Sequence, residues 1–176
     1  MHGIVSLLDE RHEKEVENLW AELAERFDIH GIYQTPFPHF SYQVAESYDL
    51  DALEAVLERF ASNAGGFNIS ASGLGVFTGP GPVLYVPVVR TRELARLHRL
   101  LWPELSEVAT GTSDYYHPRN WMPHITLANN DLTPEKLAVA AGWLGDRNLN
   151  WEIPINNLAL IHDTGDVHEL KFIFEW

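Results

Sequence analysis

The chain of 176 residues contains no cysteine and no long apolar run. Without cysteine it can form neither a disulfide nor a thiolate metal site, and it has no thiol nucleophile. No apolar stretch approaches the roughly 20 residues that a membrane-spanning helix needs. We therefore expect a protein of the reducing cytoplasm that does not enter the membrane.

Positive charge is also scarce. Twelve Lys and Arg residues stand against 25 Asp and Glu residues, which gives a formal net charge of −13. A field of that sign repels long nucleic acid, so a polynucleotide is not the expected partner. A pocket for a small phosphorylated ligand stays possible, because local hydrogen-bond donors can outweigh a distant field.

Apolar spacing along the chain predicts alternating strands and helices. An amphipathic helix is expected over 10–28, and a second one follows Asp51 and Glu54, which have the spacing of a capping box. A third covers 92–102 and extends toward Gly111, and Thr133 with Pro134 begins a fourth. Strands are expected at 2–8, 38–44, 67–77, 83–89, 123–129, 150–163 and 167–176.

One short pattern occurs twice, as "FPHFSY" at 37–42 and "MPHITL" at 122–127. Each copy has proline, histidine, any residue, a hydroxyl residue and an apolar residue. A strand, a capped helix and a hairpin follow in both cases. The repeat predicts an α+β fold of two pseudo-symmetric α/β lobes, with antiparallel-rich sheets flanking a central cleft. We expect residues 1–176 to form a single bilobal, monomeric domain with one motif in each lobe.

Strand alternation gives the repeated pattern its chemical meaning. Residues i and i+2 of a strand share a face, so His39 and Ser41 point one way while Phe40 points the other. His124 and Thr126 pair in the same manner. Two such strands beside a pseudo-twofold axis would bring two imidazoles and two hydroxyls into one space.

That set of groups suits phosphoryl chemistry. A neutral histidine can take a proton from an attacking hydroxyl or water, and a protonated one can give a proton to the leaving oxygen. The hydroxyls can donate hydrogen bonds to the non-bridging phosphate oxygens. This scheme needs no metal and no cofactor.

The pattern alone leaves two simpler interpretations open, coincidence and a pair of hydrogen-bonded histidines at the edge of the core. A third match, His162-Asp163-Thr164, sits at a strand end without the flanking proline, and we interpret it as chance. His117 lies beside Pro118 in the loop that carries Arg119. Five further histidines have no motif context and receive no role: His2, His12, His30, His98 and His168.

"PHFSY" and "PHITL" resemble the paired His-x-[Thr/Ser]-apolar motifs of the 2H phosphoesterase superfamily, which includes 2′-5′ RNA ligase-like proteins and RNA cyclic phosphodiesterases. "GPVLYVPVVRTRELARLHRLL" is similar to the central strand and helix of that family, and "LALIHDTGDVHELKFIFEW" to its closing hairpin. The resemblance implies a cleft between two lobes and reaction at phosphoester bonds. Carried over by position, it makes His39 and His124 the acid/base pair, and Ser41 and Thr126 phosphate donors.

The likeness suggests a metal-independent phosphodiesterase acting on a 2′,3′-cyclic phosphate, an oligonucleotide end or a small cyclic nucleotide. Residues 31–48 contain no Lys or Arg, however, and 113–130 contain only Arg119. Arg119 is therefore the candidate for a further phosphate contact, with Tyr115 and Tyr116 as candidates for stacking on a base. The low cation count keeps two alternatives open, a non-catalytic nucleotide- or phosphate-binding module and a 2′-5′ RNA ligase.

Overall fold

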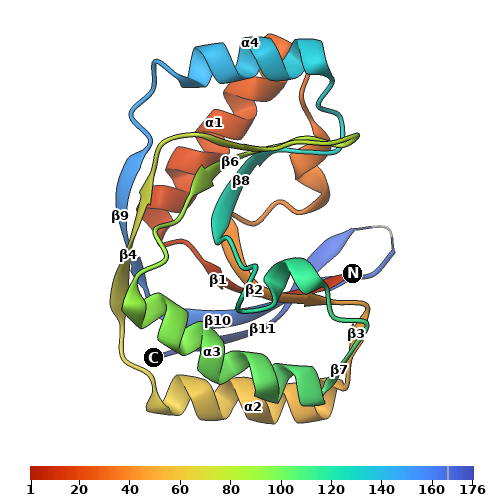
Figure 1. The fold of residues 1–176 in the computed structure, drawn as a ribbon, viewed down its shortest axis with the longest axis vertical. Helices are drawn as coiled ribbons and strands as arrows, with labels where there is room; N and C mark the ends of the chain where they lie inside the picture. Colours follow the sequence, from red (N-terminus) through yellow and green to blue (C-terminus); the bar gives the residue numbers. More distant parts are fainter. Residues whose placement is uncertain (166) are drawn as a thin grey trace.

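A computed structural model describes residues 1–165 and 167–176 of the chain. In that part, four helices alternate with strands in the predicted order (Figure 1). The helices are α1 (Glu10–Phe27), α2 (Leu50–Asn63), α3 (Arg92–Glu107) and α4 (Pro134–Leu144), with short 3₁₀ turns η1 (Gly31–Gln34) and η2 (Asp114–Tyr116). The strands are β1 (His2–Leu7), β2 (His39–Ala45), β3 (Ser47–Tyr48), β4 (Phe67–Ser72), β5 (Gly75–Phe77), β6 (Val83–Pro87), β7 (Ala109–Thr110), β8 (His124–Ala128), β9 (Asn150–Ile155), β10 (Asn157–Asp163) and β11 (His168–Glu175).

The first motif lies on the edge of a four-stranded antiparallel sheet with the order β11-β10-β1-β2. Adjacent residues Ile4 and Val5 of the inner strand β1 are both fully buried, so both faces of the sheet are covered. Ile4 belongs to the main core, whereas Val5 packs with Ala159 and Ile161 in a small separate cluster. The face that carries this small cluster is the one that borders the candidate site.

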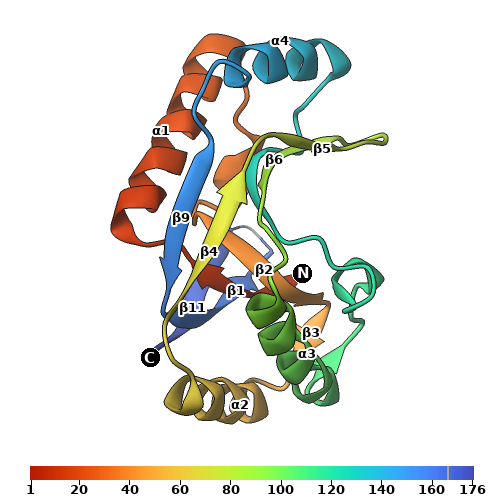
Figure 2. The ribbon, with the colours of Figure 1, turned by 60° about the vertical axis from the view of Figure 1, so that its left-hand side comes forward.

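The second motif lies on β8, in a three-stranded antiparallel sheet with the order β5-β6-β8. Strands β4 and β9 pair separately and run side by side, as Figure 2 shows. A bridge between Ala71 and Val88 and a backbone hydrogen bond of 2.8 Å from Val89 N to Ser70 O connect this pair to the β6 segment. All of these strand pairs are antiparallel, which confirms the predicted class.

The helices cover the two motif-bearing sheets in a crossed arrangement. Helices α1 and α4 lie together at one end of the molecule and α2 and α3 at the other (Figure 1). Helix α1 contacts β8, whereas α3 contacts β2 and α2 contacts β10 and β11. The N-terminal helix thus supports the second motif, and the C-terminal strands complete the sheet of the first. The lobes interleave and do not divide the chain into consecutive halves.

Two predicted strands were wrong, because each is broken where the chain leaves one sheet for another. The segment 67–77 forms β4 and β5, and Gly73 between them has a φ of 80°, a left-handed conformation that favours glycine. The segment 150–163 forms β9 and β10. Between them the carbonyl of Asn156 accepts a 2.9 Å hydrogen bond from the backbone N–H of Trp176.

The capping residues predicted for two helices were correct for α4 and wrong for α2. Thr133 caps α4 by accepting from Lys136 N at 3.2 Å, which confirms the expected start. Helix α2 is capped by Asp49, which accepts from Ala52 N at 3.2 Å, so the predicted capping box at Asp51 was wrong. Helix α3 continues through Pro103 to Glu107. The sequence also predicts a turn at 164–166 between the last two strands, and residue 166 lies outside the described residues. Every helix described is too short or too polar to cross a bilayer.

Candidate active site

The two repeated motifs meet at one cavity with a volume of about 510 Å³. Four motif side chains line it: His39 and Ser41 from β2, and His124 and Thr126 from β8. The alternate residues Phe40 and Ile125 are fully buried in the core on the other side. Because β2 and β8 also contact each other, residues far apart in the sequence face one shared space.

Both histidines are held by the same backbone contact. The Nδ1 atom of His39 bonds the carbonyl of Phe37, and Nδ1 of His124 bonds the carbonyl of Met122 at 2.8 Å. A carbonyl only accepts, so Nδ1 must carry the proton in each ring. The proline between the two partners restricts the preceding residue to extended backbone, which favours this geometry. Each Nε2 is therefore left to accept or donate a proton.

Burial keeps both histidines neutral. Burial is the main cause that lowers the pKa of His39 from 6.5 to about 4; the bond to Phe37 opposes it, and positive charge on His124 and His168 adds to it. Burial also lowers the pKa of His124, again opposed by its bond to Met122. At neutral pH both rings of the free protein thus present an unprotonated Nε2.

Two buried tryptophans brace the hydroxyl residues of the motifs. The indole N–H of Trp121, in the loop before β8, donates to the carbonyl of Ser41 at 2.8 Å. The indole N–H of Trp20 on α1 donates to the carbonyl of Thr126 at 3.1 Å. Both indoles are almost fully buried, and loss of either donor would leave a carbonyl short of a hydrogen-bond partner. Each brace comes from a segment outside the strand that it holds.

Of the three residues predicted for substrate contact, one lines the cavity and two do not. Tyr116, in η2, lines the cavity, and burial raises the pKa of its hydroxyl, opposed by the nearby Ser41. Tyr115 is 85% exposed and lies outside the cavity lining. Arg119 also lies outside the lining, in an exposed loop. Arg90 is held against the same loop by bonds to the carbonyls of Pro118 and Trp121.

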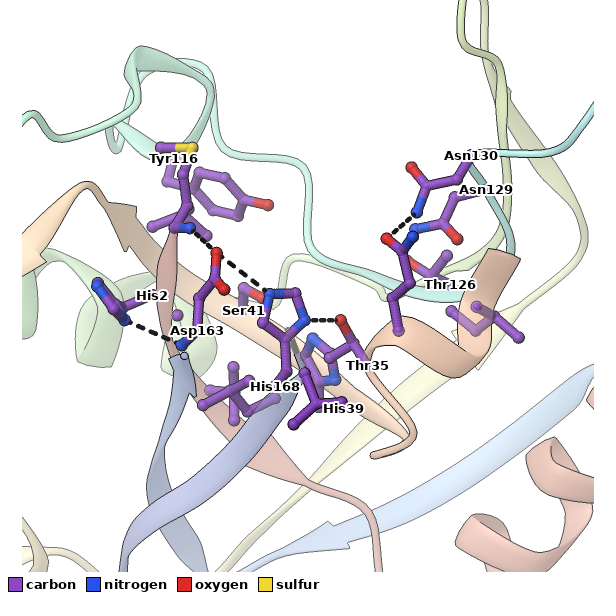
Figure 3. Close-up of a pocket in the computed structure, with 18 of the residues that line it drawn as sticks. His2, Thr35, His39, Ser41, Tyr116, Thr126, Asn129, Asn130, Asp163 and His168 are labelled. Atoms are coloured by element: carbon purple, nitrogen blue, oxygen red, sulfur yellow. Dashed lines mark hydrogen bonds and ion pairs between the residues drawn. The ribbon is translucent and has the colours of Figure 1, made fainter. Parts of the chain in front are cut away.

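Residues that had no expected role complete the cavity, as Figure 3 shows. His168 and Asp163 come from the two strands of the β10–β11 hairpin, and Thr35 follows η1. His2 accepts a 3.0 Å hydrogen bond from Asp163 N and stacks on His162, with ring centroids 4.4 Å apart. The third His-x-Thr match, interpreted as chance, therefore lies next to the site. The pairing of β1 with β10 brings it there, and a local pattern does not reveal that pairing.

The cavity contains few groups for a metal or a fixed anion site. In the part of the chain that the structure describes, no three His, Asp or Glu side chains gather in a way that could hold a metal ion. The described lining also contains no lysine or arginine side chain. Amides from Gln34, Asn129 and Asn130 form the end nearest η1, where Asn130 Nδ2 donates to Gln34 Oε1 at 3.0 Å.

Comparison with protein families gives one match, in which the model of the 2′-5′ RNA ligase superfamily covers residues 8–167. A search of curated proteins gives no match. Solved structures with the same fold include TT0787 of Thermus thermophilus, at 18% identity and a TM-score of 0.61, with 99% of this chain and 96% of that chain covered.

Two further solved structures share the fold over almost their whole length. One is LigT of E. coli complexed with 3′-AMP, at 14% identity and a TM-score of 0.62, covering 99% of this chain and 96% of that one. The other is Usb1 of Kluyveromyces marxianus, at 10% identity and a TM-score of 0.54, covering 99% and 98%.

Proposed function

The chain belongs to the 2′-5′ RNA ligase superfamily, within the 2H phosphoesterases, and we propose that it is a metal-independent phosphodiesterase that opens a small cyclic phosphate. Members of the family are phosphoesterases or RNA ligases, which supports enzymatic activity. The substrate class that we propose is a 2′,3′-cyclic phosphate, as a nucleotide or at an oligonucleotide end, or a related small cyclic nucleotide.

The observation that carries this proposal is the matched pair of imidazoles. His39 and His124 come from two strands, share one cavity and have Nδ1 bonded to a carbonyl, so both present Nε2. An acid and a base on opposite sides of phosphorus are what an in-line displacement needs. A pair of histidines that only served packing would not require the same tautomer twice.

The proposed reaction uses one histidine in each role. A neutral Nε2 takes a proton from water as the water oxygen forms a bond to phosphorus. The other histidine, protonated at Nε2, gives that proton to the ribose oxygen as its bond to phosphorus breaks. The product is a phosphate monoester, and the two histidines have exchanged one proton. The anionic substrate raises the pKa of the nearby imidazoles, which favours the protonated form of one of them.

The hydroxyls stabilise the charge on phosphorus. Ser41 and Thr126 each lie two positions beyond a motif histidine, on the same strand face, where they can donate to non-bridging oxygens. Backbone braces from Trp121 and Trp20 hold both positions in place. LigT was solved with 3′-AMP, and a ligand of that size supports a small nucleotide or RNA-end substrate for this chain.

The test is turnover of adenosine 2′,3′-cyclic phosphate in the presence of EDTA by the wild type, His39→Ala and His124→Ala. We expect either substitution to lower kcat at least 100-fold, because general acid–base catalysis contributes on the order of 10²–10⁴-fold. His30→Ala is the matched control, since His30 is exposed and lies outside the cavity lining. Circular dichroism checks that each variant is folded.

Two outcomes would contradict the proposal. Full activity of the double variant would remove the histidines from the chemistry. Tight binding of the cyclic phosphate without product at any pH would instead favour a nucleotide-binding module, an alternative supported by the absence of Lys and Arg from the described cavity lining. The acidic composition disfavours 2′-5′ RNA ligation, which predicts weak binding of labelled RNA even at low salt.

A further inference from the structure

The cavity proposed to bind a phosphodiester has an unusual charge balance. Its described lining contains no Lys or Arg side chain, and burial drives both motif histidines toward the neutral form. An anion in a partly buried space needs a positive partner or several donors, because removing it from water costs several kcal/mol. The amino group of Met1, which also lines the cavity, is already paired with Asp163, so a phosphate needs a further donor.

His168 is placed to supply it. The residue begins β11 at the end of the β10–β11 hairpin, lines the cavity and keeps 26% of its side chain exposed. Its Nδ1 atom bonds the hydroxyl of Thr35, and its Nε2 atom lies 3.6 Å from Oδ2 of Asp163. In Figure 3 the ring lies beside His39, between Thr35 and Asp163.

Several polar and titratable groups face the ring of His168. Asp163 on β10 presents a carboxylate to it. His39 on β2 is the other titratable neighbour, and it is neutral when His168 is charged. The amino group of Met1 bonds the same oxygen of Asp163, Oδ2, and His2 accepts from the backbone N–H of Asp163. Thr35 is uncharged and contacts Nδ1, whereas Nε2 lies beyond hydrogen-bond distance of Asp163 and is the nitrogen that can donate to a substrate oxygen.

We propose that His168 is a third histidine of the substrate site and that it binds an anionic phosphate oxygen of the substrate as an imidazolium. The inference rests on the proposed function for the identity of the substrate, but anion binding is measurable without turnover. His168 forms no covalent bond and transfers no proton in this role. It supplies the charge that arginine or lysine supplies elsewhere, and only at pH values where it is protonated.

The experiment measures the affinity of inorganic phosphate by calorimetry at pH 6 and pH 8, for the wild type, His168→Gln and His168→Lys. At pH 6 we expect His168→Gln to bind about 10-fold more weakly than the wild type, since it loses a charge-assisted hydrogen bond to the phosphate oxygen. At pH 8 this difference should almost vanish. His168→Lys should bind more tightly than His168→Gln at both pH values, because lysine is charged at both.

Thr35→Val separates charge from structure. It removes the hydroxyl that contacts Nδ1 but keeps the imidazole. If the imidazole binds phosphate, Thr35→Val should lose less phosphate affinity than His168→Gln. Equal losses in the two variants without rescue by lysine would mean that the ring only holds the hairpin, and this would overturn the proposal. Wild-type affinity of His168→Gln at pH 6 would do the same. If that variant does not fold, phosphate-induced shifts of the His168 ring nitrogens in the wild type provide the readout, and their absence overturns the inference.

The outcomes distinguish this inference from the proposed function. Phosphate binding that depends on His168, in a protein without turnover, would contradict only the phosphodiesterase. If turnover requires His39 and His124 but phosphate affinity does not change when His168 is replaced, only the inference is contradicted. Steady-state kinetics adds a second readout, because a binding role predicts a rise in KM for His168→Gln with a smaller change in kcat.

Discussion

At the scale of single residues, the two motif histidines are not equivalent. His39 lies near His124 and His168, and its pKa, lowered mainly by burial, falls to about 4. His124 instead packs against Phe77 and Tyr85, with ring centroids at 4.9 and 5.1 Å. The lower pKa makes His39 the ring that more readily stays neutral, as the base must, and leaves His124 more readily protonated, as the acid must. We therefore predict that His39 is the base and His124 the acid, roles that the repeated motif leaves interchangeable.

This assignment predicts how the variants respond to the leaving group. A nitrophenolate needs no proton to depart, so a nitrophenyl phosphodiester removes the demand for an acid. We expect His124→Ala to regain at least about 10-fold of its lost activity on that substrate, whereas His39→Ala stays inactive. The measurement is the initial rate of each variant relative to the wild type, first on the nitrophenyl ester and then on the cyclic phosphate. If only His39→Ala regains activity on the nitrophenyl ester, His39 is the acid and His124 the base.

The motif residues could be predicted from the sequence, whereas their neighbours could not. His39, Ser41, His124 and Thr126 share a face because strand alternation is local and the flanking prolines mark both strands. His168 enters the cavity only because β10 pairs with β1, an interaction between opposite ends of the chain. Periodicity carries no information on such long-range pairing, and a lone histidine in a hairpin gives no signal of its own.

At the scale of elements, the crossed packing explains how two sheets present one site. Helix α1 supports β8, and the loop before β8 contacts β2 through Trp121. The sequence predicts the helices and most strands, because apolar stripes and caps are local. It does not predict which sheet each strand joins, so 67–77 and 150–163 each read as one strand although each crosses between sheets.

The two tryptophan braces should be functional as well as structural. Trp121→Phe keeps the ring packing but leaves the carbonyl of Ser41 without its buried donor, at a cost of about 1–3 kcal/mol in stability. A displaced hydroxyl also weakens phosphate contact, so we expect kcat/KM to fall about 10-fold. Trp20→Phe should act similarly through Thr126.

Trp143→Phe is the matched control for these variants. Trp143 lies on α4, where Arg147 sits over its ring at 4.3 Å, and it is not part of the cavity lining. Urea unfolding and steady-state kinetics should show little change for this variant. Equal kinetic losses in all three would mean that any tryptophan substitution loosens the fold, and the specific role of the braces would be wrong.

At the scale of the whole molecule, the net charge of −13 surrounds a site that we propose binds an anion. The field opposes every phosphate that approaches, and the opposition grows with the number of phosphates on the substrate. Local charge from His168 acts only over the short distances inside the cavity. A small cyclic phosphate therefore experiences less repulsion than an RNA that ends in the same group.

This balance predicts a salt dependence opposite to that of ordinary nucleic-acid-binding proteins. Raising NaCl from 10 to 100 mM shortens the screening length from about 30 to about 10 Å and weakens the repulsion. We expect KM for a ten-nucleotide RNA with a cyclic phosphate end to fall about threefold, with a smaller decrease for adenosine 2′,3′-cyclic phosphate. Steady-state kinetics in a phosphate-free buffer measures both. A KM that rises with salt would mean that local cations govern the approach of RNA, because released counterions then dominate binding.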